Sequence, residues 1–94
     1  MNALDQQARP SFARGVRVQL DPKTQEPMLL FPEGAVYLSE TAYAIVTRCS
    51  GELTTQAIID SLASEYETDS ESLRQDVLDC LRDLHQRKLL VFSK

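Results

Sequence analysis

Residues 35–51, AVYLSETAYAIVTRCSG, constrain the fold of this 94-residue chain more than any other stretch. Ser39 is a natural N-cap, because its hydroxyl can accept from N–H groups that the first helical turn leaves unpaired. Leu38 and Tyr43 are spaced as a hydrophobic staple, and Gly51 supplies the left-handed residue that closes many helices. The stretch therefore predicts a short strand at 35–38 that runs without a loop into a helix at 40–49. Such an arrangement is typical of a docking surface and carries no catalytic chemistry.

Two further strands are predicted before this stretch. Residues 16–20 alternate apolar and polar side chains, as a strand with one buried face does. A turn with Pro22 at its second position leads to a strand at 26–31, and a turn through Pro32 and Gly34 leads to 35–38. Three short strands with tight connections predict an antiparallel meander, with the third strand as a candidate edge. Residues 1–13 are expected to form a flexible arm, and 14–94 a single domain.

Two more helices follow. Thr54 is the predicted cap of the second helix, and the third begins near Thr68 or Asp69, where Thr68 and Glu71 have the spacing of a capping box. The third helix carries an apolar stripe, and Leu78 lies off it; the stripe is Leu73, Val77, Cys80, Leu81 and Leu84. The closing apolar run at 89–92 is either a packed tail or a strand that returns to the sheet. The predicted fold is α+β and winged-helix-like, a three-stranded antiparallel β-meander followed by a three-helix bundle.

Composition excludes several classes of protein. The net charge of −4 opposes binding to a phosphate backbone. No apolar run approaches the roughly 18 residues that span a bilayer, and the first ten residues lack the apolar centre of a signal peptide. We therefore expect a cytoplasmic protein without a membrane segment. Cys49 and Cys80 are expected to be buried and reduced, although the sequence leaves a disulfide between them open.

Catalytic chemistry finds little support in this chain. An active site needs a nucleophile with a base, a metal cluster or paired carboxylates, and this chain has one histidine and no glycine-rich phosphate loop. His85 lies near the end of the third helix, where it complements the helix dipole. Asp83 and Arg87 lie at i and i+4, the pattern of a solvated helix face. We expect no catalytic residue, no cofactor and no metal site.

Two binding functions remain. A winged-helix module can bind DNA or regulate transcription, but the third helix carries five acids against four bases, whereas a DNA-binding helix needs a basic patch. An exposed strand edge can instead bind a peptide as an added strand, if apolar anchors supplement the backbone bonds. A groove between the third strand and the third helix would supply them, with a far wall of Leu78, Leu81, Arg74 and Arg82. The alternative is that Leu78 packs against a neighbouring helix. The same edge and the arm allow a homodimer.

Several short motifs, in their order and spacing, resemble the PqqD family of pyrroloquinoline quinone biosynthesis from residue 9 to residue 91. They are Arg9-Pro10, Arg14-Gly15-Val16-Arg17, Asp21-Pro22, Leu30-Phe31-Pro32-Glu33-Gly34, Leu38-Ser39-Glu40-Thr41-Ala42, Cys49-Ser50-Gly51, Asp76-Val77-Leu78 and Lys88-Leu89-Leu90-Val91. Many relatives have Asp where this chain has Ser50, and Asn or Asp where it has Ser39. Both departures keep the local capping chemistry.

The resemblance implies a peptide chaperone, not an enzyme. Family members bind the ribosomal precursor peptide PqqA and present it to the radical SAM enzyme PqqE, and the same fold recognises leader peptides in many peptide-modifying systems. The leader there lies as an added strand between strand three and helix three. Carried onto this chain, the peptide-binding residues are Val36, Tyr37, Leu38, Arg74, Val77, Leu78, Leu81 and Arg82. Periodicity leaves open that Val77 and Leu81 belong wholly to the core.

Overall fold

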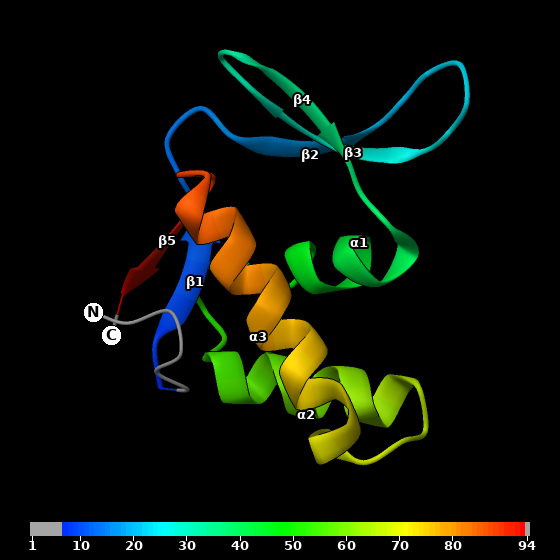
Figure 1. Cartoon of the computed structure of the whole chain (residues 1–94), viewed down its shortest axis with the longest axis vertical. Coiled ribbons are helices and arrows are strands. Elements are labelled where there is room, and N and C mark those ends of the chain that lie inside the picture. Colours follow the sequence, from blue (N-terminus) through cyan, green and yellow to red (C-terminus); the bar gives the residue numbers. More distant parts are fainter. Residues whose placement is uncertain (1–6, 94) are drawn as a thin grey trace.

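Residues 7–93 form two small sheets and three helices (Figure 1). The computed structural model describes residues 7–93. The elements in chain order are β1 (Arg9–Phe12), β2 (Arg17–Leu20), β3 (Pro27–Phe31), β4 (Gly34–Tyr37), α1 (Glu40–Val46), α2 (Thr55–Glu65), α3 (Ser70–Gln86) and β5 (Leu90–Ser93). In Figure 1 the β2–β3–β4 sheet lies above the helices, and the β1–β5 pair lies beside the C-terminal end of α3.

The predicted meander is confirmed. The larger sheet has the order β2-β3-β4, and both pairs are antiparallel. Each observed strand begins within a residue of its predicted position. Strand β4 is at an edge of this sheet, as expected, because β3 is the central strand and β2 pairs with its other side.

The second sheet differs from the prediction for the N-terminal arm. Residues 9–12, assigned to a flexible arm, form β1 and pair with β5 in the register Arg9↔Ser93 to Phe12↔Leu90. The backbone N–H of Gly51 also donates to the Pro10 carbonyl at 3.0 Å, so the segment after α1 holds β1 from its other side. Ala8 is buried as well, and the Ala13 N–H donates to the Leu89 carbonyl at 3.0 Å. Residues 1–6 of the predicted arm lie outside the described residues. The closing apolar run is a strand, but it joins β1 and not the meander.

Three side-chain caps begin the helices. Ser39 accepts from the Ala42 N–H at 3.0 Å, and Thr54 accepts from the Ala57 N–H at 3.1 Å, as predicted. Asp69 caps α3 by accepting from the Ser72 N–H at 2.8 Å, which selects Asp69 over Thr68. That bond also lowers the pKa of the Asp69 carboxyl, because it favours the charged form.

Helix α1 ends earlier than predicted. It stops at Val46, with Thr47 as its C-cap, and so the left-handed Gly51 does not close it. Gly51 has φ +87°, and a Cβ there would lie 3.5 Å from Cβ of Ser11 on β1. That distance is an ordinary contact, so the left-handed backbone favours glycine here and lack of space does not. The residue lies beyond the end of the helix, and its N–H is bonded to β1.

A single hydrophobic core joins the β2–β3–β4 sheet to the helices and β5. Its buried members are Leu29, Ile45, Val46, Cys49, Ile58, Ile59, Leu62, Val77, Leu81, Leu84, Leu89 and Leu90. Leu29 on the central strand is fully buried, and so the inner face of the sheet rests on this cluster. Between residues 7 and 93, no helix has the length and apolar content needed to cross a membrane.

Candidate functional site

The outer edge of β4 offers backbone groups to a partner strand. The N–H of Leu38 donates to the Pro27 carbonyl at 2.9 Å, which makes Leu38 and Pro27 a hydrogen-bonded pair. Bonding alternates along an antiparallel strand, so Val36 also directs its backbone groups toward β3. Ala35 and Tyr37 therefore direct their N–H and C=O groups away from the sheet. In the part of the chain that the structure describes, β4 pairs with β3 alone, and the C-terminal strand pairs with β1.

The side chains of β4, and of Leu38 directly after it, follow the same alternation. Val36 and Leu38 are half-buried, and Leu38 packs against the core. Tyr37 is 58% exposed, and its hydroxyl donates to Oδ2 of Asp21 at 2.8 Å. The Lys23 N–H and the Tyr37 hydroxyl, which both donate to Asp21, lower the pKa of this carboxyl, and the same carboxylate raises the pKa of Tyr37. Tyr37 thus ties the edge strand to the β2–β3 turn.

Two of the residues predicted on the helical wall belong to the core. Val77 and Leu81 are 0% exposed, because the apolar stripe of α3 packs on α1, α2 and β5 and belongs to the core cluster that also holds Leu29. A side chain without exposed surface cannot contact a peptide in this conformation. Their assignment to the peptide-binding wall is therefore corrected, and both support the wall from within.

The other three predicted wall residues, Arg74, Leu78 and Arg82, lie together along one side of α3. Arg74 donates from Nη1 to Oε1 of Gln56 on α2 at 3.0 Å. His85 stacks edge-on against Phe92 of β5, with ring centroids 5.1 Å apart. At 3.6 residues per turn, the half-buried Leu78 lies within about 40° of both Arg74 and His85. This margin therefore borders α2 and β5. Arg82, also on this side, pairs with Asp79 at 3.8 Å.

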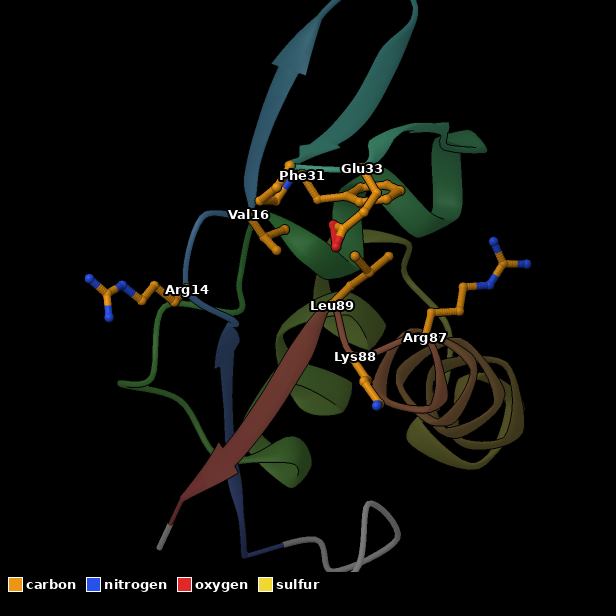
Figure 2. A pocket seen from close by; sticks show the side chains of 8 residues that line it. Arg14, Val16, Phe31, Glu33, Arg87, Lys88 and Leu89 are labelled. Carbon is orange, nitrogen blue, oxygen red and sulfur yellow. The ribbon is translucent and has the colours of Figure 1, made fainter.

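The opposite margin of α3 borders the β3–β4 turn. Arg87, the C-cap of α3, lies roughly 180° around the helix from Leu78. Its Nε donates to Oδ1 of Asp83 at 3.4 Å and lies 3.3 Å from Oδ2, which confirms the predicted i, i+4 pair. A cavity of about 410 Å³ separates this end of α3 from the turn (Figure 2). Its lining residues are Arg14, Val16, Phe31, Pro32, Glu33, Arg87, Lys88 and Leu89.

The predicted peptide-binding residues are thus only partly brought together. Val36 and Tyr37 lie on the edge strand and Leu38 directly after it, but none of the eight predicted residues lines the cavity. The sequence interpretation did not single out the outward backbone of Ala35 or the Asp83–Arg87 margin, which lie beside these edge residues and the cavity in the structure. The only sequence signal for that margin was the i, i+4 charge pair, which fits a solvated helix face equally well.

The two cysteines are free thiols. Burial raises the pKa of Cys49 to about 12, and burial together with the Asp83 charge raises that of Cys80 to about 11. Neutral thiols of this kind are poor nucleophiles and poor metal ligands. Among residues 7–93, no group of three or more His, Cys, Asp and Glu side chains is placed to hold a metal ion.

The chain is similar to proteins of one family. The family described as Coenzyme PQQ synthesis protein D (PqqD) matches residues 26–90. A PqqA binding protein of Xanthomonas axonopodis pv. citri is 32% identical over 90 residues, which cover 96% of this chain and 98% of that protein. A PqqA binding protein of Xanthomonas campestris pv. campestris is 31% identical with the same coverage.

Two solved structures agree with the fold. One is the solution structure of the PqqD part of Methylobacterium extorquens PqqCD, a stand-alone recognition element for ribosomally synthesised and post-translationally modified peptides. It is 30% identical, with a TM-score of 0.75 and 87% of each chain covered. The crystal structure of PqqD from Xanthomonas campestris is 32% identical, with a TM-score of 0.58, and covers 84% of this chain and 88% of that one.

Proposed function

Because the chain belongs to the PqqD family, we propose that it binds a PqqA-type precursor peptide as an added strand on the free edge of β4. The protein would act as a chaperone that presents the peptide to the radical SAM enzyme PqqE, with no reaction of its own. The observation that carries this proposal is the outer edge of β4, with which no strand pairs among residues 7–93, because the C-terminal strand β5 pairs with β1 instead.

Backbone pairing alone is too weak for specific binding. Ala35 and Tyr37 offer two N–H and two C=O groups outward. Bonds to these groups contribute about 0.5–1.5 kcal/mol each, whereas association costs at least about 4 kcal/mol in lost freedom. Apolar anchors must supply the difference, at ~1.5–3 kcal/mol for each buried side chain. The half-buried Val36 and the apolar lining of the cavity beside β4 are the surfaces that we assign to them.

The helical wall of the proposed site is the Asp83–Arg87 margin of α3. Arg87 shares the cavity with Phe31 and Glu33 of the β3–β4 turn, and Gly34 begins β4 directly after Glu33. A peptide paired with β4 therefore reaches this margin at one end. The margin through Arg74 and Leu78 is directed to α2 and β5, and it is not part of the proposed site.

Titration of ¹⁵N-labelled protein with a synthetic PqqA peptide tests the proposal. We expect the largest amide shifts at Ala35 and Tyr37, whose N–H groups gain a partner, and at Asp83 and Arg87. Amides near Leu78 should shift less. Shifts at the Leu78 margin without shifts on β4 would refute the proposed site. No shifts at a peptide concentration of 1 mM would refute peptide binding itself.

Presentation to PqqE needs its own measurement. Cross-linking of the peptide by purified PqqE should accelerate when this protein is added, and the protein alone should leave the peptide unmodified. An unchanged rate would refute the presentation role while leaving peptide binding intact. The cytoplasmic location, the homodimer and the lack of nucleic-acid binding stay predictions from the sequence.

A further inference from the structure

We propose that the cavity between the β3–β4 turn and the end of α3 selects precursor peptides that carry an apolar anchor next to acidic side chains. This inference rests on the proposed function, because it assigns chemistry to the peptide segment that continues beyond β4. The cavity combines an apolar interior with a cationic rim, and it is lined by Glu33, the residue directly before β4.

The interior suits a large apolar side chain. Val16, Phe31 and Leu89 come from three separate segments, and in Figure 2 they converge on one space. Leu89 is buried in the core, whereas Val16 and Phe31 are half-buried and pack against it. A volume of about 410 Å³ accommodates a leucine or an aromatic ring with room to spare. Filling this space would bury apolar surface that the free protein leaves in water.

The rim is positive in an otherwise acidic protein. The cavity is lined by three cations, Arg14, Arg87 and Lys88, and by one acid, whereas the whole chain carries a net charge of −4. Arg87 is paired with Asp83, but within residues 7–93 no ion pair engages Arg14 or Lys88. In Figure 2 the charged ends of Arg14 and Arg87 extend outward on opposite sides of the cavity. Carboxylates on a peptide that crosses this rim would meet unneutralised positive charge.

Glu33 is expected to have the opposite effect on peptide affinity from the cations of the rim. Figure 2 shows its carboxylate directed into the space above Leu89, between the cationic side chains. It repels an acidic peptide at short range, and so it should lower the affinity that the rim provides. Replacing Glu33 should therefore strengthen binding, whereas a peptide with a cation in the cavity would pair with Glu33 and bind less tightly after the same change.

The position of the cavity links it to the edge strand. Gly34, the first residue of β4, follows Glu33 directly, and strands advance about 3.3 Å per residue. A peptide opposite Ala35 therefore reaches the cavity within two or three residues. Selection by this cavity would act on the segment that flanks the paired residues, not on the paired residues themselves.

Lys88 permits a variant that removes rim charge without weakening the fold. It has φ +64° at the end of α3, where its N–H donates to the His85 carbonyl and the Leu89 N–H donates to the Leu84 carbonyl. This is a Schellman motif, whose left-handed position favours glycine. Glu67 occupies the same position after α2, with φ +53°, and lies outside the cavity. Lys88→Gly and Glu67→Gly are thus matched backbone changes, and only the first alters the rim.

The test measures the affinity of a labelled synthetic PqqA peptide by fluorescence anisotropy at low and high salt. The Arg14→Gln/Lys88→Gly double variant should bind about three- to tenfold more weakly than the parent protein, and its affinity should depend less on salt. Glu33→Gln should bind about two- to threefold more tightly. Glu67→Gly, and Lys23→Gln on the distant β2–β3 turn, should bind within twofold of the parent protein.

A second peptide, with every Asp and Glu replaced by its amide, identifies the interacting charge. The parent and the double variant should bind this neutral peptide equally. If the parent binds the original peptide and the double variant binds it equally well, the inference is overturned while the proposed function stands. If the double variant loses PqqE binding while its peptide affinity is unchanged, the rim would be a contact surface for the enzyme, and the inference would also be overturned. If the parent binds neither peptide, the proposed function itself has failed.

Discussion

Ala35→Pro tests strand addition at β4 most directly. Proline lacks a backbone N–H, and the N–H of Ala35 is directed away from β3. The ladder bonds to β3 come from Gly34, Val36 and Leu38, so they survive the substitution. Edge strands accept proline where the missing N–H faces solvent. The variant should therefore fold and lose one donor to the peptide.

The expected loss of peptide affinity follows from the peptide carbonyl that is left without a hydrogen-bond donor. A peptide carbonyl opposite Ala35 would be enclosed by the added strand without its donor, which costs about 1–3 kcal/mol. At 1.4 kcal/mol for each factor of ten, this is about a five- to 140-fold increase in Kd. Isothermal titration of a synthetic PqqA peptide measures the Kd, and urea unfolding shows whether the sheet has kept its stability.

Leu20→Pro provides the matched control at the other edge of the same sheet. The Asp21 N–H donates to the Glu26 carbonyl, and by alternation the N–H of Leu20 is directed away from β3. Leu20 is 42% exposed, and its change should leave the Kd within twofold. A stably folded Ala35→Pro variant that binds as tightly as the parent would refute strand addition at β4. Equal losses in both variants would show that the effect is not specific to this edge.

The remaining predictions concern α3, the core and the thiols. Leu78→Arg should change the peptide Kd less than threefold, because its margin faces α2 and β5; a tenfold loss would restore that margin to the site. Leu29→Ala should lower the free energy of unfolding in urea by about 2–5 kcal/mol, since Leu29 is fully buried, and a loss under 1 kcal/mol would contradict the described core. Cys49 and Cys80, with pKa values raised to about 12 and 11, should react slowly with a disulfide reagent at pH 8 until urea unfolds the protein. Stability should fall as the pH rises above about 8.5, because the unfolded thiols ionise first, and pH-independent unfolding up to pH 10 would contradict the burial.

Local chemistry made the meander and the helix starts predictable. Ser39 and Thr54 cap their helices as predicted, because an N-cap interaction spans only three residues of sequence. The end of α1 was misplaced, because the left-handed Gly51 lies beyond the C-cap Thr47 and its N–H bonds to Pro10 of β1. The β1–β5 pair was not predicted, because its register joins residues more than 75 positions apart in the chain and local sequence does not encode such a pairing.

The sequence by itself determined that α3 has an apolar face and two margins, and that a short strand ends at the Ser39 cap. Periodicity does not show which margin of a helix borders a sheet, because a helix stripe is flanked alike on both sides. The tertiary structure decided that Arg87 lines one cavity with the β3–β4 turn, while Leu78 lies on the opposite side of the helix. It also decided, through the bond from Leu38 to Pro27, that Ala35 and Tyr37 present the open backbone. Both features depend on strand register and on packing between segments that are distant in the chain, and neither can be read from local sequence.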